Sequence, residues 1–161
     1  MLASDELEIQ VVRGESDLDA VRALWVEYWD SLGFSPEFQG FAEELRSLPG
    51  VYGDAGGRLL LATLGGTPVA TAALRSIGPR ACEVKRLYVR PAARGKGIAQ
   101  ALLRWLMDDA RAARCSEMFC DTLGSMDSAL RLYRTLGFAE VAPYSADPTP
   151  GAVFLRLNLG G

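Results

Sequence analysis

The sequence contains no histidine among its 161 residues. This absence excludes sites in which a histidine activates a serine or cysteine nucleophile, and it removes the ligand that many zinc sites use. Three cysteines, Cys82, Cys115 and Cys120, stand in apolar contexts without the spacing of a metal site. An odd number of such thiols argues against a disulfide framework and predicts reduced, buried cysteines. We therefore expect a cytoplasmic protein that uses no metal.

Long apolar runs and an excess of positive charge are also missing. No segment approaches the ~20 apolar residues that a membrane-spanning helix needs. The acidic stretch of residues 1–6 lacks the apolar core of a secretory signal. A net charge of −3 argues against general binding to nucleic acid. We expect neither a membrane nor a nucleic-acid partner.

What the chain does have is enough apolar sequence for one sizeable core. Apolar residues make up 49% of the sequence, and no linker or internal repeat interrupts it. The predicted strands cover residues 8–13, 58–64, 68–77, 81–89, 117–123, 138–141 and 152–159. Residues 1–161 are therefore predicted to form a single domain.

Four helices are predicted between these strands. The first is capped by Ser16 or Asp17 and ends at Gly33, and the second begins at Pro36 and includes Phe38. The third covers residues 98–113, and the fourth is capped by Ser125 or Asp127 and ends at Gly137. This order is typical of a mixed α/β domain. The last strand, apolar at alternate positions, is a candidate sheet edge that pairs between subunits, so a monomer or a homodimer is expected.

The most informative motif is the turn Arg94-Gly95-Lys96-Gly97-Ile98-Ala99. Its two glycines remove side chains and allow backbone amides to approach a ligand closely. The turn follows the apolar run 87–89 and opens a helix, whose N-terminus favours an anion. No acidic residue stands between Arg90 and Asp108. These features predict a phosphate or pyrophosphate site, and the alternative is a tight strand-to-helix turn without a ligand.

Two better-known glycine motifs do not fit this turn. The GxxxxGK[ST] pattern of a P-loop is absent. In a dinucleotide fingerprint a third glycine or an alanine would stand where this chain has Gln100. A nucleotide-binding domain stays an alternative hypothesis on these residues alone.

Three segments together resemble the GNAT superfamily of N-acetyltransferases. They are Val89-Arg90-Pro91, the glycine turn, and Ala129-Leu130-Arg131-Leu132-Tyr133-Arg134-Thr135-Leu136-Gly137-Phe138. The predicted order of elements is similar to that fold from about Glu8 to Leu159. The resemblance implies a central mixed, splayed sheet of about seven strands flanked by four helices, with acetyl-CoA as co-substrate and no metal.

The resemblance also implies where an acyl-CoA is held. The molecule would lie in the opening between the strand that ends at Val89 and the strand that begins near Glu117. Its pantetheine arm would pair with the backbone of Leu87, Tyr88 and Val89 like an added strand. Its pyrophosphate would bind the amides of Arg94, Gly95, Lys96, Gly97, Ile98 and Ala99.

One position departs from the pattern of the family. The family often has an asparagine seven residues before its tyrosine, and Met126 stands there in this chain. Ser125 or Ser128 is expected to supply the polar contact to the acyl-CoA instead.

Two residues carry the chemistry that the resemblance implies. Tyr133 would protonate the departing CoA thiolate, a role that suits a phenol with a pKa near 10; the alternative is a core aromatic residue. Glu83 stands at a position similar to one where some family members place a glutamate that accepts the proton of the amine. The alternative for Glu83 is a salt bridge near Lys85 and Arg86, and Asp121 is a second candidate base.

The acceptor pocket is less well marked. The helices over residues 16–48 are expected to form one wall, with most of their aromatic residues in the core and one or two lining the pocket, chosen from Tyr28, Trp29 and Phe34. The basic residues Arg75, Lys85 and Arg86 either attract a carboxylate or phosphate on a small acceptor or form a solvated strand face. The loop over residues 143–151, with Tyr144, is long enough to act as a lid.

The leading hypothesis is an N-acetyltransferase. It would move an acetyl group from acetyl-CoA to a primary amine of a small molecule, amino acid or peptide, by direct attack in a ternary complex. A non-catalytic acyl-CoA-binding regulatory domain is the alternative, which Met126 and the uncertain base leave open. Release of CoA in the presence of amines would distinguish the two.

Overall fold

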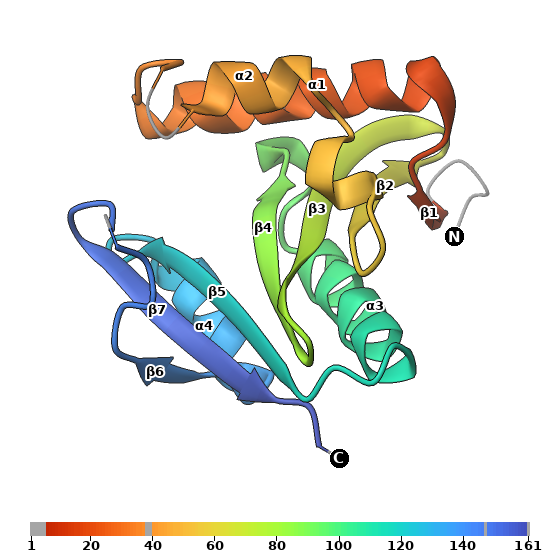
Figure 1. The fold of residues 1–161 in the computed structure, drawn as a ribbon. Helices are drawn as coiled ribbons and strands as arrows, with labels where there is room; N and C mark the ends of the chain where they lie inside the picture. The colour runs from red at the N-terminus through yellow and green to blue at the C-terminus, as the bar shows by residue number, and fades with distance from the viewer. Residues whose placement is uncertain (1–5, 38–39, 147, 161) are drawn as a thin grey trace.

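In the computed structural model, which describes residues 6–37, 40–146 and 148–160, seven strands form one sheet in the order β1-β2-β3-β4-β5-β7-β6 (Figure 1). The strands are β1 (Leu7–Val11), β2 (Arg58–Leu64), β3 (Thr67–Gly78), β4 (Ala81–Val89), β5 (Glu117–Leu123), β6 (Ala139–Val141) and β7 (Ala152–Asn158). The sheet is mixed, because β4 and β5 run parallel and the other described pairs are antiparallel.

The parallel pair is where the sheet opens. Its pairing covers three rungs, from Ala81 opposite Glu117 to Glu83 opposite Phe119. Beyond that rung β4 and β5 diverge, and Figure 1 shows the sheet as two arms that meet near the bottom of the view. The predicted splay is confirmed, and its apex lies at Glu83.

Helices cover both faces of the sheet. On one face lie α1 (Gly14–Leu32) and α2 (Phe41–Arg46), followed by the short 3₁₀ helix η3 (Gly50–Gly53); on the other lie α3 (Ile98–Ala112) and α4 (Asp127–Thr135). Side chains alternate across a strand, so on β2 Leu59 and Leu61 pack with α1 whereas Leu60 and Ala62 pack with α3. Two apolar cores therefore hold the sheet from its two sides.

Three of the predicted strands, β2, β4 and β5, have the bounds expected from the sequence. The helix starts differ from expectation. The N-caps of α1 and α4 are Arg13 and Met126, and neither side chain makes a capping bond. At α1 the Asp17 carboxylate instead accepts a 2.8 Å bond from the Arg13 amide.

The second helix also begins later than predicted. It starts at Phe41, after Gly40 with a φ of 69°, and Pro36 lies in a turn before it. Phe38, included in the predicted helix, lies outside the described residues. A left-handed backbone at Gly40 suits glycine and separates the turn from α2.

The prediction that the last strand is a sheet edge is wrong. β7 lies between β5 and β6 and pairs with both, so its backbone is occupied on each side. The edges of the described sheet are β1 and β6. Alternate apolar residues on β7 reflect burial against α4, because Leu155 and Leu157 belong to the core on that face.

The cysteines agree with the expectation of reduced thiols. Cys82 and Cys120 are buried, Cys115 is half-buried, and all three are free thiols. Among the described residues, none of the helices combines the length and the apolar character needed to cross a membrane.

Candidate functional site

The glycine turn has the geometry of an anion cradle. The 3₁₀ helix η4 (Pro91–Ala93) and the turn connect β4 to α3. Gly95 and Gly97 have φ values of 80° and 78°, in the left-handed region that favours glycine. A Cβ built on either residue would meet no atom within 4 Å. The backbone conformation therefore requires the two glycines, and the space that their missing side chains leave is open to a ligand.

The donors of this cradle are available. Within the described part of the chain, the amides of Gly95 to Gln100 donate to no backbone or side-chain acceptor, and the first bond of α3 runs from the Ala101 amide to the Gly97 carbonyl. The macrodipole of α3, a helix of 15 residues, adds partial positive charge at the same point. Lys96 is exposed beside the turn. These features fit a pyrophosphate group.

Next to the cradle, β4 carries a β-bulge. Between the pairs Thr71–Tyr88 and Ala73–Lys85, one residue of β3, Ala72, faces two residues of β4, Leu87 and Arg86. Arg86, inside the bulge, has a φ of 57°. In the described chain β4 has no strand partner on the β5 side beyond Glu83, so its backbone at Leu87 borders the opening. At Val89 the carbonyl accepts a 2.9 Å bond from Arg94 Nε.

The bulge directs Arg86 under the helical layer rather than toward a ligand. Its guanidinium lies over the rings of Trp25, Trp29 and Phe41, at 5.7, 5.0 and 5.4 Å from their centroids. Its Nε donates a 3.0 Å bond to Glu44 of α2. With its side chain only 8% exposed, Arg86 mainly joins α1 and α2 to β4.

A narrow cleft of about 90 Å³ lies in the opening of the sheet. Val84 to Leu87 of β4 line one side, and Asp121 to Leu123 of β5 line the other. The remaining walls come from α1, from α4 with the residue before it, from the segment after α1 and from the start of β7 with the loop before it: Tyr28, Trp29, Leu32, Phe34, Met126, Ala129, Tyr133, Thr149 and Ala152. One or two of Tyr28, Trp29 and Phe34 were expected to line the acceptor pocket, and all three line this cleft. Ser125 and Ser128 are exposed and do not line it.

Tyr133 lies at the base of this cleft. Its side chain is buried, and its ring packs edge-on against Phe138 with centroids 5.2 Å apart. Burial raises the pKa of its phenol well above the ordinary value, and the neighbouring Cys120, Tyr28 and Asp121 raise that pKa further. The hydroxyl therefore keeps its proton at neutral pH.

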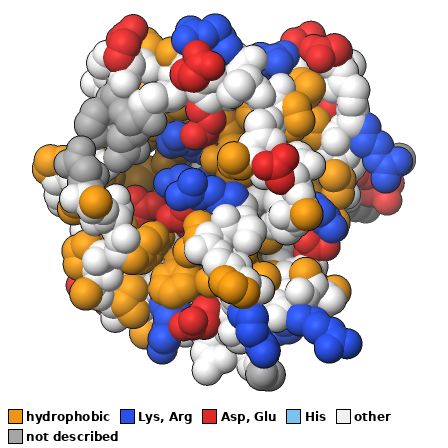
Figure 2. All heavy atoms as spheres, viewed as in Figure 1, with side chains coloured by type: hydrophobic (Ala, Val, Ile, Leu, Met, Phe, Trp, Pro, Cys, Tyr) orange, Lys and Arg blue, Asp and Glu red, His pale blue; other side chains and the backbone are white. Residues whose placement is uncertain are grey.

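A wider hollow of about 700 Å³ adjoins the cleft on the side of α2 and η3. Its charged lining comprises Glu43, Glu44, Arg75, Glu83, Lys85, Arg86 and Asp121. Figure 2 shows basic side chains in the middle of this face, with acidic side chains beside them and apolar side chains below. Lys85, Arg86 and Asp121 line both cavities, so the cleft and the hollow share a wall.

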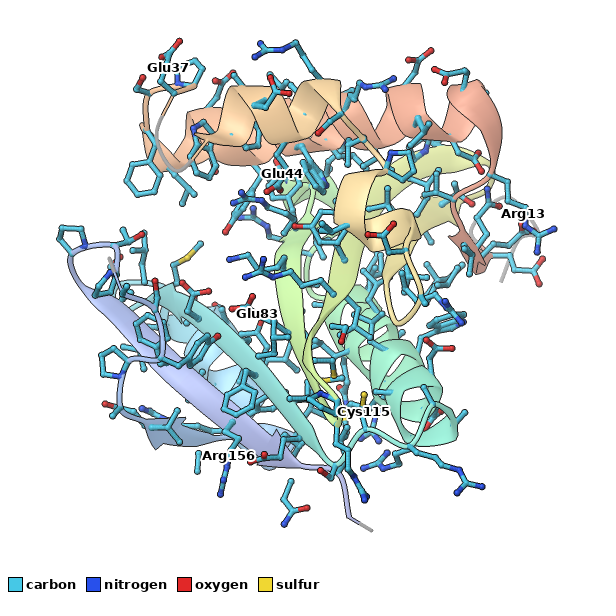
Figure 3. All side chains as sticks on the ribbon, viewed as in Figure 1. Arg13, Glu37, Glu44, Glu83, Cys115 and Arg156 are labelled. Carbon is cyan, nitrogen blue, oxygen red and sulfur yellow. The ribbon has the colours of Figure 1, made fainter. Side chains whose placement is uncertain are left out.

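Glu83 is buried at the apex of the opening, at 3% exposure (Figure 3). Its Oε1 accepts a 2.8 Å bond from Arg75 Nε, and its Oε2 accepts a 2.7 Å bond from the Tyr144 hydroxyl. The salt bridge given as the alternative role of Glu83 is therefore present, but its partner is Arg75 and not Lys85 or Arg86. Arg75 is the partner because it stands directly opposite Glu83 in the β3–β4 register.

The loop before β7 contributes Tyr144, whose contact with Glu83 the sequence did not predict. Its ring packs edge-on against Phe119 and Phe154, with centroids 5.1 and 4.9 Å away. Burial, followed by the bond to Glu83, raises the pKa of the Tyr144 phenol far above its ordinary range. No local motif signals this contact, because residues 83 and 144 are brought together only by the tertiary fold.

The other two charges of the shared wall face each other across the opening. Lys85 on β4 and Asp121 on β5 form an ion pair with 3.7 Å between Nζ and Oδ1. Both residues were singled out from the sequence, Lys85 for a possible anion and Asp121 as a candidate base, but not as partners.

A mixed sheet that opens at its parallel pair, with an anion cradle beside the opening, is the architecture of acyl-CoA-dependent acyltransferases. Comparison with known families agrees. The profile of the acetyltransferase (GNAT) family matches residues 18–138, and the chain belongs to that family. The predicted family, fold class and enzyme class are confirmed: the protein is a GNAT acyltransferase.

Full-length relatives and solved structures support the assignment. An uncharacterized N-acetyltransferase of Schizosaccharomyces pombe is 34% identical over 161 residues, 99% of each chain. An acetyltransferase structure from Streptococcus agalactiae superposes with a TM-score of 0.82 at 16% identity, covering 94% of this chain and 98% of the other. An acetyltransferase of Salmonella typhimurium, solved with its cofactor acetyl-CoA, gives 0.73 at 20% identity, with 97% and 95% covered. At these identities the structures show a shared fold.

Proposed function

We propose that residues 1–161 form one N-acetyltransferase domain that moves an acetyl group from acetyl-CoA to a primary amine of a small molecule, amino acid or peptide. The attack is direct, in a ternary complex. The observation that carries this proposal is the wall shared by the cleft at Tyr133 and the hollow at Glu83. A donor in the cleft and an acceptor in the hollow meet at this wall, which is the arrangement that direct transfer needs.

The donor is held by backbone groups in this proposal. The amides from Gly95 to Ala99 bind the pyrophosphate, and the open edge of β4 at Leu87, Tyr88 and Val89 pairs with the pantetheine arm. The Arg94 amide, also expected in the cradle, instead donates a 3.3 Å bond to the Pro91 carbonyl. When bound, acetyl-CoA supplies an activated thioester. Met126 and Ala129 line the cleft where a polar contact was expected from Ser125 or Ser128. Binding of acetyl-CoA therefore depends mainly on the glycine cradle and the edge of β4.

Tyr133 and Glu83 move the protons. In the reaction the amine nitrogen bonds to the acetyl carbon as the carbon–sulfur bond breaks. An ammonium acceptor loses two protons on becoming an amide. Tyr133 delivers one proton to the sulfur and is reprotonated from solvent. Glu83 accepts one of the two protons of the ammonium, directly or through a water, and the other is released to solvent. The remaining lone pairs of Glu83 serve this role while Arg75 and Tyr144 keep its carboxylate in place.

The experiment that tests the proposal is release of free CoA from acetyl-CoA in the presence of amine acceptors. We expect CoA release that requires both the amine and the protein, with the acetylated amine as the other product. Binding of acetyl-CoA without turnover across amines, amino acids and peptides would instead identify a regulatory acyl-CoA-binding domain.

A further inference from the structure

Lys85 and Asp121 lie two rungs beyond the last paired rung of β4 and β5, where the sheet has opened. The last paired rung is Glu83 opposite Phe119. Two residues further along each strand the side chains return to the same face of the sheet. Lys85 and Asp121 therefore point into the same space as Glu83, but from strands that no longer pair. Their ion pair spans the opening.

This ion pair differs from the other two in the hollow. Arg75–Glu83 and Arg86–Glu44 are hydrogen-bonded at 2.8 and 3.0 Å. The Lys85–Asp121 distance of 3.7 Å exceeds the range of a hydrogen bond. Within the described residues neither Lys85 nor Asp121 makes any other polar side-chain contact. Of the three cations in the hollow, Lys85 thus keeps the greatest capacity to bind a ligand.

The pair is also accessible from both cavities. Lys85 and Asp121 line the cleft and the hollow alike, and their side chains are 20% and 25% exposed. Partial burial strengthens the interaction of each charge with a ligand relative to a fully solvated site. An acceptor that reaches the shared wall therefore meets one positive and one negative group a few ångströms apart.

We infer that the acceptor is a small zwitterion of the α-amino acid class, and this inference rests on the proposed function. Asp121 binds the ammonium group and Lys85 binds the carboxylate, while Glu83 lies beneath them. The amino nitrogen and the carboxyl carbon of an α-amino acid are about 2.5 Å apart, because both are bonded to one carbon. That spacing allows one molecule to satisfy both members of the pair.

Other amines fit this pair less well. A polyamine or the N-terminus of a peptide brings a positive charge without an adjacent anion. Such an acceptor would pair with Asp121 but would leave the Lys85 ammonium facing a cation. An uncharged amide in place of the carboxylate would remove the attraction to Lys85. Lys85 is therefore the residue expected to determine specificity among amines.

The first test uses the unaltered protein and three acceptors with one side chain: leucine, leucinamide and 3-methylbutylamine. We expect kcat/KM for leucine to exceed that of the other two at least tenfold, mainly through KM. Calorimetry with the CoA-loaded protein measures leucine and leucinamide binding independently of turnover, and leucine should bind at least tenfold more tightly. Equal or better turnover and binding of the two uncarboxylated amines would overturn the inference.

Two variants separate the roles of the pair. Lys85→Gln should reduce the preference for leucine over leucinamide to less than threefold, and it should lower KM for 3-methylbutylamine, because Asp121 then faces that amine without a competing cation. Asp121→Asn should raise KM for all three acceptors. The matched control is Arg156→Gln, which breaks a 2.9 Å ion pair with Glu117 on β5 that lines neither cavity (Figure 3). It should preserve the leucine preference.

The outcomes distinguish this inference from the proposed function. CoA release that is fastest with 3-methylbutylamine, or a full leucine preference retained by folded Lys85→Gln, would overturn the inference and keep the acetyltransferase. Failure of every amine to release CoA would overturn the proposed function. In that case leucine binding that is no tighter than leucinamide binding would overturn the inference as well. Acetyl-CoA affinity and melting temperature confirm that each variant is folded.

Discussion

The Tyr144 hydroxyl donates a 2.7 Å hydrogen bond to Oε2 of Glu83, so the loop before β7 is attached to the buried carboxylate at the apex of the sheet. The loop that was expected to act as a lid thus already contacts one wall of the hollow. Arg75 holds the other carboxylate oxygen from β3. The orientation of Glu83 therefore depends on two segments that flank the opening.

Two substitutions can therefore test the negative charge of Glu83 separately from its hydrogen bond to Tyr144. Glu83→Gln removes the proposed proton acceptor, and we expect kcat to fall by about 100-fold or more. Tyr144→Phe keeps the carboxylate and the ring packing and removes one hydrogen bond, worth about 1 kcal/mol. Its kcat should fall less than tenfold. Equal losses in steady-state kcat for the two variants would indicate that Glu83 positions the loop and does not accept the proton.

Tyr133→Phe is expected to lower kcat by about 100-fold or more, because the leaving thiolate would lose its proton donor. The buried ring and its contact with Phe138 are kept, so the melting temperature and the Kd for acetyl-CoA should change little. Rapid-quench turnover and calorimetric titration measure the two quantities. Turnover equal to that of the unaltered protein would show that Tyr133 is not the proton donor.

The glycine cradle is tested by Gly97→Ala. An alanine in the left-handed conformation costs about 1–2 kcal/mol, and its methyl group would occupy the open space in front of the amides. We expect acetyl-CoA to bind at least tenfold more weakly.

Gly66→Ala is the matched control, because Gly66 has a φ of 84° and an equally open surrounding in the β2–β3 turn. This variant should lose similar stability but bind acetyl-CoA normally. Equal binding by both variants would show that the cradle does not hold the ligand.

Alkaline pH should destabilise the fold. Burial raises the pKa of all five tyrosines and of Cys82 and Cys120, with Cys82 raised to about 12. The unfolded chain loses these protons near the ordinary values of 9 for thiols and 10 for phenols, before the folded chain does. Stability is therefore present below pH 9 and declines above it. A melting temperature that stays constant from pH 8 to pH 10.5 would contradict this expectation.

The raised pKa of Tyr133 also determines the expected pH dependence of kcat. Because the pKa of Tyr133 lies above 10, its phenol stays protonated throughout the range in which most amine acceptors lose a proton. We expect kcat at saturating substrates to show no decline between pH 8 and pH 10. Short assays at low temperature separate this profile from alkaline unfolding. A basic limb near pH 9 that disappears in Tyr133→Phe would contradict the raised pKa.

The sequence by itself determined the features that depend on local backbone chemistry. Glycines at positions 95 and 97, a preceding apolar strand and a following amphipathic helix are sufficient to predict an anion cradle, because conformation and donors lie within one segment. The bounds of β2, β4 and β5 follow from local pattern in the same way. The motif that ends at Phe138 predicted a catalytic role for Tyr133, and the structure places its buried side chain in the lining of the cleft.

The tertiary structure alone decided which charges meet. Arg75, rather than Lys85 or Arg86, pairs with Glu83 because the register of β3 and β4 places the two residues opposite each other. Lys85 meets Asp121 because β4 and β5 stop pairing two rungs earlier, and β7 is interior because β6 pairs with its other side. Strand order, register and splay arise from contacts between distant segments, which local pattern does not encode. The choice of partners at the site therefore depended on long-range packing.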